Sequence, residues 1–342
     1  MLLPGREQGC KFLAMRQYHP AIINEDQAIA RLQSLERPWA SDYLVMYSSW
    51  LDGIVREPWL MQVPIDDHVV HRGDGVFEMS KCVAGRIYQL DRHLVRLANS
   101  AQAIQLELPA DLGALKRLVV AVTRAGGVPD CAVRIFLSRG PGGFTTNPFE
   151  CPEPGVYVMV SHLHNPPATA FANGVRLGVS QVPSKSGFYA SVKSCNYLPN
   201  VLLKREALCR GWDYGLGLDE DGFLAEGSTE NVGLVDQGNR LRLPLPHHIL
   251  EGTTVRRATE LAAGLVDAGR LAGIEHRPLS RVDLDQAREV MLFGTTLDVL
   301  PVTRLEDQPV GDGRPGPVAQ ELLALMRRDI LENPEVSTPA FE

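Results

Sequence analysis

Apolar side chains recur along the chain in two patterns, and each pattern predicts a different kind of element. Runs rich in β-branched and aromatic residues predict strands, at 42–50, 75–83, 86–90, 132–138, 155–163, 174–182 and 288–296, with a further β-rich stretch at 213–235. Apolar residues three and four positions apart predict helices, at 91–104, 114–125, 198–211, 254–266 and 317–330, with a further candidate at 22–35. Strands and helices are mixed in both halves without strict alternation, which predicts an α/β protein or a mixed α+β one.

Several residues mark where these elements begin and end. Ala84-Gly85 lies between two predicted strands, and its glycine suits the turn of a hairpin. Asp91 is expected to cap the helix that follows, because its side chain can accept hydrogen bonds from the free amides of a first turn. Gly211 is expected to end the helix over 198–211.

The length of 342 residues suits two domains, at roughly 100–200 residues each. The segment 165–173 contains small residues and prolines and has no periodicity, which favours a linker. We therefore predict an N-terminal extension over 1–40, a smaller α/β domain over 41–164, the linker over 165–173 and a larger domain over 174–342.

Composition and charge narrow the class of protein. Hydrophobic residues make up 44% of the chain and charged residues 22%, which is typical of a globular protein with a buried core. The net charge of −7 lacks the basic excess of a nucleic-acid-binding protein, and no run approaches the ~18 apolar residues of a membrane helix. The six cysteines have no C-x-x-C spacing, which favours reduced thiols. The apolar run of the first segment is interrupted by Pro4 and Arg6, which is not typical of a secretory signal. Both observations favour a cytoplasmic location.

The common short motifs of nucleotide-binding proteins and hydrolases are absent. The sequence has no P-loop, no dinucleotide-binding G-x-G-x-x-G, no H-E-x-x-H and no G-x-S-x-G. We interpret the glycine-rich 140–143 as a plain turn in preference to an anion-binding nest. His247 and His248 have no cysteine or carboxylate nearby, so we interpret them as loop residues and expect no metal site.

Lys193 stands among small and apolar residues, in the segment SVKSC just before a predicted helix. A lysine in a dry pocket has a lowered pKa and can form a Schiff base with a carbonyl, such as that of pyridoxal phosphate. A partly buried structural lysine is the other interpretation, and this segment alone does not separate the two.

Pyridoxal phosphate makes further chemical demands, and the sequence offers a candidate for each. The ring nitrogen needs an acid, and Glu226 lies beside a glycine in a β-rich stretch. The phosphate needs amides, hydroxyls and an arginine, and the candidates are Thr253 and Thr254 at a helix start, Thr295 and Thr296 after a strand, and Arg96 on a helix. Thr254 as a plain helix cap and Arg96 as a solvated helix residue remain alternatives.

The segments VKSCNYLPNVLLKREA, LAEGSTENV, EGTTVRRATELA and GTTLDVLPV resemble the class-IV, fold-type IV pyridoxal-phosphate enzymes. That family comprises branched-chain aminotransferases, D-amino-acid aminotransferases and aminodeoxychorismate lyases. The motifs GDGVFE, DRHLVRLANSA and GDGRPGPVAQ occur in the same order, and the match runs over 42–330. Within the family, YLVMYSS, LSRGPGGF and FYASVKSCNYLPN most resemble the plant D-amino-acid transaminase-like branch.

The resemblance implies two α/β domains with pyridoxal 5′-phosphate between them, a homodimer, and a role for each motif residue. Lys193 would hold the cofactor as a Schiff base and move the proton of the reaction. Glu226 would pair with the pyridinium nitrogen and Tyr197 would donate to the phenolic oxygen. The phosphate would be bound by Arg96, Thr254 and Thr295 with the amides of Thr253 and Thr296, and the substrate side would be lined by Phe77 and Thr296.

The substrate is less clear than the reaction. The segment 139–148 lacks the Arg-x-His pair with which bacterial D-amino-acid aminotransferases bind a carboxylate. Arg72 replaces the substrate-side tyrosine of branched-chain enzymes, and is either a substrate ligand or an ion-pair partner of Asp66, Asp67 or Asp74.

We therefore predict an amino-acid transaminase. It would move an amino group between a D-amino acid, or a branched-chain amino acid or glutamate, and a 2-keto acid. The alternatives are a 4-amino-4-deoxychorismate lyase giving 4-aminobenzoate and pyruvate, which Met79 makes less favourable, and a non-catalytic pyridoxal-phosphate-binding protein.

Overall fold

The computed structural model describes residues 20–185, 187–246 and 249–341, which fall into two compact units, Met1–Pro38 and Trp39–Glu342. In the first unit, α1 (Glu25–Ser34) forms within the predicted helix over 22–35, and Asn24 and Gln27 close its first turn with a capping box. The rest of the predicted extension up to residue 19, and the predicted loop pair His247-His248, lie outside the described residues.

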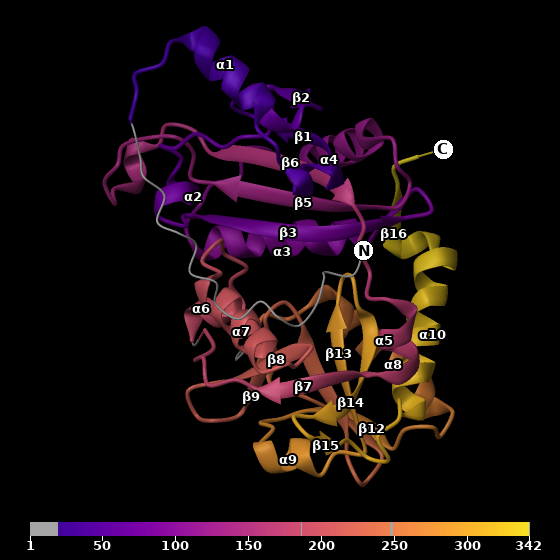
Figure 1. Cartoon of the computed structure of the whole chain (residues 1–342). Helices are drawn as coiled ribbons and strands as arrows, with labels where there is room; N and C mark the ends of the chain where they lie inside the picture. The colour runs from indigo at the N-terminus through magenta and orange to yellow at the C-terminus, as the bar shows by residue number, and fades with distance from the viewer. Residues whose placement is uncertain (1–19, 186, 247–248, 342) are drawn as a thin grey trace. The chain divides into compact units, whose positions relative to one another are not determined.

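The second unit contains a sheet built mainly from the first half of the chain (Figure 1). Its described strands run in the order β16-β4-β3-β5-β6-β1-β2, and neighbouring strands are antiparallel. The predicted hairpin between β3 and β4 is confirmed, with φ of 48° at Ala84 and 76° at Gly85, as a tight two-residue turn requires. The strands are β1 (Tyr43–Ser48), β2 (Gly53–Val55), β3 (Gly75–Val83), β4 (Arg86–Tyr88), β5 (Cys131–Ser138), β6 (Gly155–His162) and β16 (Ser337–Pro339).

The second sheet of this unit runs in the order β12-β11-β10-β13-β14-β7-β8-β9, with β15 beside β14. Asn231 on β10 also pairs with Glu226 on β9, so two strands that are far apart in this order meet. Glu226 therefore lies where the sheet closes on itself. The strands are β7 (Val175–Val179), β8 (Tyr214–Leu218), β9 (Leu224–Gly227), β10 (Asn231–Val235), β11 (Arg240–Leu243), β12 (Gly273–His276), β13 (Glu289–Gly294), β14 (Asp298–Leu305) and β15 (Gln308–Pro309).

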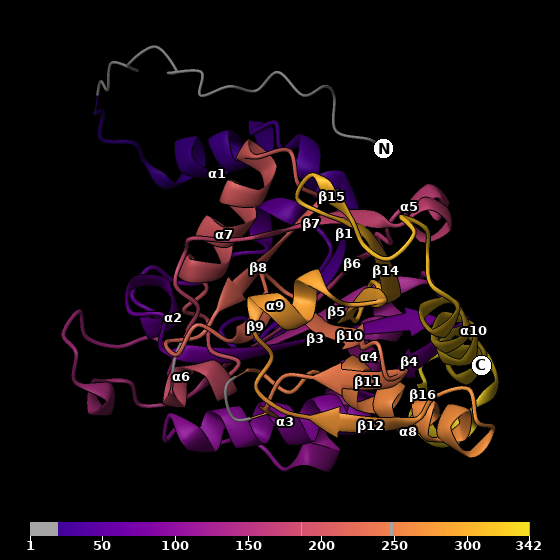
Figure 2. The ribbon, with the colours of Figure 1, turned by 90° about the horizontal axis from the view of Figure 1, so that it is seen from below.

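The helices of the second unit cover the faces of the two sheets. Helix α3 packs on β3 and on α4, and α8 lies beside α10 (Figure 2). Both α8 and α10 pack against β13. Among the described helices, none combines the length and the apolar character needed to cross a lipid bilayer. The described α-helices of the second unit are α2 (His68–His71), α3 (Leu90–Ala103), α4 (Leu112–Gly126), α5 (Ala168–Asn173), α6 (Phe188–Ser191), α7 (Leu198–Cys209), α8 (Thr253–Asp267), α9 (Arg281–Asp285) and α10 (Pro317–Glu332).

The segment around Lys193 is anchored to the first sheet, although it follows β7 in the chain. Val192 is buried in the hydrophobic core that α3 and α4 form with this sheet. The amide of Phe77 donates to the carbonyl of Lys193 at 3.0 Å, and the amide of Cys195 donates to the carbonyl of Gly75 at 2.8 Å. The small and apolar residues beside Lys193 therefore let its backbone lie against β3, which holds the lysine next to Phe77.

The structure confirms the mixed α/β class and differs from the sequence expectations at particular points. Asp91 is not a cap: α3 begins at Leu90 after Gln89, and Asp91 lies in the first turn, where it pairs with Lys116. The predicted linker over 165–173 contains the short helix α5. Strand β16, from the end of the predicted larger domain, pairs with β4 of the first sheet. The domain boundaries themselves stay a prediction.

Candidate active site

One cavity of the second unit brings together the predicted site residues, with the exception of Arg72. Its walls come from both sheets, from the start of α8 and from the segment between α6 and α7. The predicted residues that line it are Phe77, Arg96, Lys193, Tyr197, Glu226, Thr253, Thr254, Thr295 and Thr296. Residues that the sequence places up to about two hundred positions apart thus share one small volume, which makes this cavity the candidate active site.

Lys193 points into the cavity between two aromatic rings. Its Nζ lies 3.3 Å from the Tyr197 hydroxyl oxygen and 4.5 Å from the centre of the Phe77 ring. Burial and the nearby Arg96 charge lower the pKa of Lys193 to about 8. About a tenth of this amine is therefore unprotonated at pH 7, far more than of an ordinary lysine, and the unprotonated form is the one that acts as a nucleophile or a base.

This lowered pKa has a measurable consequence in the ligand-free protein. An amine attacks an acylating reagent only after losing its proton, so the reactivity of Lys193 should rise with pH through about 8 and then level off. Trace acetylation at a series of pH values, read by mass spectrometry, measures this midpoint, with the surface lysine Lys116 as internal reference. A Lys193 midpoint near the ordinary lysine value of about 10.4 would contradict the dry environment inferred for this amine.

Glu226 is the second reactive group of the cavity. Its Oε2 accepts a hydrogen bond from the amide of Leu250 at 3.1 Å. Burial raises the pKa of Glu226 to about 7, although the charges of Lys185 and Lys193 act in the opposite direction. The carboxyl can thus gain or lose a proton near neutral pH. A carboxyl with this property is suited to pair with the protonated ring nitrogen of pyridoxal phosphate.

Arg96 is held in place by a buried carboxylate that the sequence analysis did not single out. Glu78 on β3 is fully buried, and it accepts from Arg96 Nε at 2.6 Å and from Arg96 Nη2 at 2.8 Å. Arg96 Nη1 donates to the carbonyl of Glu251 at 3.0 Å, just before α8. The predicted alternative of a solvated helix arginine is therefore wrong, because this guanidinium is directed at the cavity by Glu78.

His93 extends this network to the start of α8. Burial lowers the pKa of His93, so its imidazole is neutral at neutral pH. Its Nδ1 lies 2.7 Å from the Glu78 carboxylate and must be the donor there, which leaves Nε2 to accept from the Thr253 hydroxyl at 3.3 Å. Both missed residues belong to the motifs GDGVFE and DRHLVRL, and His93 lies one helical turn before Arg96.

The start of α8 and the turn between β13 and β14 form a polar end of the cavity. Helix α8 begins at Thr253 after Gly252, and no side chain among the described residues caps its first turn. Thr254 is therefore not the cap, and the first residues of α8, Thr253 and Thr254, line the cavity together with Arg96. A helix N-terminus beside an arginine is a typical site for a phosphate group.

Arg72 lies away from this cavity. Its guanidinium donates to the backbone carbonyls of His71, Phe144 and Thr145. Asp74, one of its predicted ion-pair partners, pairs instead with Arg139 at 3.0 Å. The role of Arg72 as a substrate ligand stays a prediction that its contacts here do not support.

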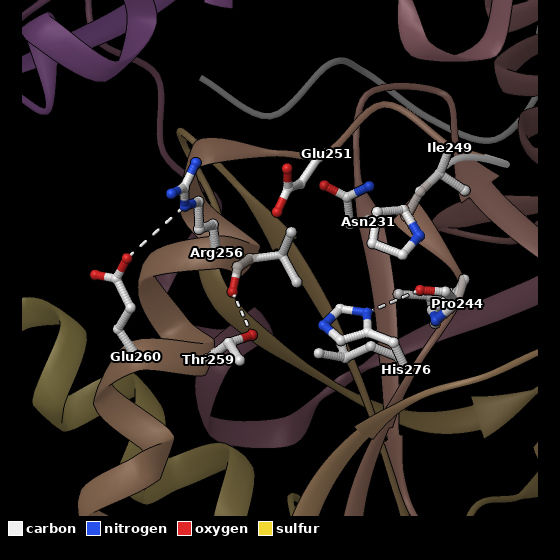
Figure 3. A pocket seen from close by; sticks show the side chains of 12 residues that line it. Asn231, Pro244, Ile249, Glu251, Arg256, Thr259, Glu260 and His276 are labelled. Atoms are coloured by element: carbon white, nitrogen blue, oxygen red, sulfur yellow. Dashed lines mark hydrogen bonds and ion pairs between the residues drawn. The ribbon is translucent and has the colours of Figure 1, made fainter.

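A second cavity, of about 160 Å³, lies between β10, β11 and the first turns of α8 (Figure 3). Two of its polar side chains are engaged with neighbours: His276 bonds to the carbonyl of Pro244 at 3.0 Å, and Arg256 lies 3.9 Å from Glu260. None of its described lining residues is a lysine or a cysteine. Of these two cavities, the first is the one with a described lysine in its lining, Lys193.

Comparison with known proteins identifies the family of this chain. The family model of amino-transferase class IV matches residues 75–305. The chloroplastic D-amino-acid transaminase of Arabidopsis thaliana is 38% identical over 296 residues, which are 85% of this chain and 78% of that protein. A putative branched-chain-amino-acid aminotransferase of Methanocaldococcus jannaschii is 29% identical over 266 residues, 76% of this chain and 88% of that protein.

The fold also matches solved structures over most of the chain. A branched-chain amino acid aminotransferase solved with pyridoxamine 5′-phosphate has a TM-score of 0.80 at 26% identity, and the match covers 87% of this chain and 99% of that chain. Fold and site together thus define a fold-type IV aminotransferase. The chain belongs to the amino-transferase class IV family, which confirms the resemblance seen in its motifs.

Proposed function

We propose that this chain is a pyridoxal-5′-phosphate-dependent amino-acid transaminase, which moves an amino group from an amino acid to a 2-keto acid. The observation that carries the proposal is the position of Lys193, whose Nζ lies 3.3 Å from the Tyr197 hydroxyl in the cavity that also contains Glu226 and the start of α8. The names of the relatives support a transaminase over the lyase alternative.

The described residues fit this cofactor. Gly252 approaches Asn231 so closely that a Cβ at this position would collide with the side-chain amide oxygen of Asn231, so a larger residue here would force the Asn231 side chain to move. Arg96, Thr254 and Thr295, with the amides of Thr253 and Thr296, would bind the phosphate. Glu226 would face the ring nitrogen, Tyr197 the phenolic oxygen and Lys193 the aldehyde carbon.

Each residue then has a task in the reaction. The bound cofactor supplies an electron-withdrawing ring that stabilises negative charge at the substrate Cα. Lys193 takes the proton from Cα and later returns a proton, and its lowered pKa suits both directions near neutral pH. The hydroxyl of Tyr197 keeps the Lys193 amine aimed at the reacting carbon. The rings of Phe77 and Tyr197, which lie edge to face, exclude water from this side of the cavity.

The donor belongs to one of two classes. The first is D-amino acids, as in the name of the Arabidopsis relative. The second is branched-chain amino acids and glutamate, in line with the name of the Methanocaldococcus relative and with a branched-chain aminotransferase solved in complex with N-(5′-phosphopyridoxyl)-L-glutamate. Phe77, Met79 and Thr296 line the side of the cavity where the substrate would lie. We propose that the acceptor is a 2-keto acid in either case.

We also propose that the enzyme acts as a homodimer in the cytoplasm. The exposed apolar side chains of Phe188, Tyr189, Leu198 and Val201 on α6 and α7 support a second copy as the partner. Light scattering of the purified protein distinguishes a dimer from a monomer.

The function is tested by loading the purified protein with pyridoxal 5′-phosphate and adding single amino acids. L-glutamate, D-glutamate, D-alanine, L-leucine and 4-amino-4-deoxychorismate are added in turn, while the visible absorption band and the released keto acid are followed. We expect one donor to bleach the band and release its keto acid in equal amount, which identifies both class and hand. Pyruvate and 4-aminobenzoate formed from 4-amino-4-deoxychorismate without lasting bleaching would contradict the proposal in favour of a lyase, and a protein that takes up no cofactor would contradict both.

A further inference from the structure

Lys81 and Asp298 form a buried ion pair that joins the two sheets of the second unit. Lys81 lies on β3 of the first sheet, and Asp298 is the first residue of β14 in the second sheet. The Lys81 ammonium donates to the Asp298 carboxylate, and the two side chains are only 5% and 13% exposed. Taking two charges out of water is costly, and a well-packed apolar pair could join the same strands. This position therefore calls for a reason beyond packing.

Asp298 follows directly on the turn between β13 and β14, at the polar end of the cavity. The amide of Leu297 donates to the carbonyl of Gly294 at 3.1 Å and closes this turn. Thr295 and Thr296 within the turn line the cavity. Asp298 has a φ of 55°, in the left-handed region that favours glycine and, among other residues, asparagine and aspartate. Aspartate is thus one of the few residues that suit this backbone and also place a carboxylate at the base of the turn.

Strand β3 supports the turn at a second point. The hydroxyl of Thr295 donates to the carbonyl of Met79 at 3.4 Å. Phe77 and Met79 on the same strand line the cavity, and residues two apart on a strand share a face, so Lys81 continues this row. The turn is therefore attached to the strand that forms the opposite part of the cavity wall.

The two attachments respond differently to a bound phosphate. A hydroxyl has one hydrogen to donate, so a Thr295 hydroxyl that donates to a phosphate oxygen no longer donates to Met79. Neither Lys81 nor Asp298 is among the described residues that line the cavity, so their pair does not compete with the phosphate for a donor. The ion pair is thus the attachment that can hold the turn both before and after binding.

We propose that Lys81 is a positioning residue for the phosphate end of the site. Through its ion pair with Asp298 it fixes the β13–β14 turn against β3, which keeps Thr295 and the amide of Thr296 in place when the phosphate binds. The proposal rests on the function proposed above, which assigns these two groups to the phosphate. An ion pair suits this task because a charge-assisted hydrogen bond is directional, whereas apolar contacts are not. The competing explanation is that the pair contributes to stability alone.

The test compares pyridoxal 5′-phosphate with pyridoxal, which differs only in lacking the phosphate. Both react with the Lys193 amine, and the absorption band of the product gives the affinity for each ligand. We expect Lys81→Met to weaken binding of pyridoxal 5′-phosphate about tenfold, the effect of one displaced hydrogen bond to a charged group, and to leave binding of pyridoxal unchanged. Lys81→Arg keeps the cation and should stay near wild type. Unchanged affinity for pyridoxal 5′-phosphate in Lys81→Met, or an equal loss for both ligands, would overturn the proposal.

A double-mutant cycle tests whether the two residues act as one unit. Asp298→Asn removes the charge and keeps a residue that tolerates a φ of 55°. Lys81→Met and Asp298→Asn together should weaken binding of pyridoxal 5′-phosphate no more than either change alone, and additive losses would contradict the pair. Should Lys81→Met fail to fold, Lys81→Gln and Asp298→Asn provide the same comparison of the two ligands.

Arg242→Met is the matched control for a loss of stability. It breaks a partly buried ion pair with Asp236, and neither residue lines the cavity. We expect this variant to unfold more readily than wild type and to bind pyridoxal 5′-phosphate as wild type does. A wild-type protein that takes up no pyridoxal 5′-phosphate would contradict the proposed function, whereas uptake with equal affinity in wild type and in the Lys81 variants would overturn this inference alone.

Discussion

A Lys193→Ala variant is expected to lose transamination by at least about 10²–10⁴-fold, the usual contribution of a positioned acid–base group. The variant removes the amine that lies 3.3 Å from the Tyr197 hydroxyl, and no other described lysine lines this cavity. Folding should be retained, because the backbone of Lys193 makes the contacts to β3 and these do not depend on its side chain. The measurement is the single-turnover rate of keto-acid release with the best donor of the wild-type enzyme.

Binding of the cofactor should survive in part. The phosphate ligands proposed on α3, α8 and the β13–β14 turn are untouched in this variant, so equilibrium dialysis should still show uptake of pyridoxal 5′-phosphate, with weaker affinity and without the covalent attachment that borohydride traps in wild type. Lys116→Ala, which removes a surface lysine paired with Asp91, is the matched control and should keep wild-type turnover. Full activity of Lys193→Ala would exclude Lys193 as the acid–base group.

The sequence predicted the elements of the fold well wherever the signal is local. Apolar spacing placed α4 and α8 within two residues of their observed ends, because a helix buries one face and the pattern of that face is continuous along the chain. Strand β16 was missed because its three residues have no pattern of their own and become a strand only through pairing with β4. Contacts between distant segments are the part of the fold that local pattern cannot supply.

The same distinction holds for the site. Motif residues such as Lys193 and Thr254 were predicted because short segments around them are distinctive. Glu78 was missed because its role depends on His93 and Arg96, which reach it from a helix elsewhere in the chain. Arg72 was predicted to lie on the substrate side because of its place in the motif. Its guanidinium instead donates to the carbonyls of Phe144 and Thr145. Side-chain direction is decided by partners that the motif does not contain.

A Glu78→Gln variant is expected to be destabilised strongly. Burial alone would raise the pKa of Glu78, but Arg96 and His93 outweigh burial and hold this pKa well below its usual range. Glutamine keeps the shape of the side chain and removes its charge, so the Arg96 guanidinium loses its buried counter-ion. Loss of one partner of a buried ion pair lowers the free energy of unfolding by about 3–5 kcal/mol. Urea denaturation at neutral pH measures this difference. Glu321→Gln, which breaks a surface pair with Arg270, is the matched control and should cost less than about 1 kcal/mol.

The pH dependence of this difference identifies its electrostatic origin. Because the pKa of Glu78 is lower in the folded than in the unfolded state, its stabilising contribution is complete above the ordinary glutamate pKa of about 4.3 and declines as pH falls below that value. The stability difference between wild type and Glu78→Gln should therefore begin to shrink below about pH 4 and should vanish only below the folded-state pKa of Glu78. Affinity for pyridoxal 5′-phosphate should fall in the variant as well, since Glu78 directs Arg96 at the proposed phosphate site. A constant difference in stability down to low pH would mean that Glu78 acts through packing, and unchanged cofactor affinity would mean that Arg96 keeps its direction through the Glu251 carbonyl alone.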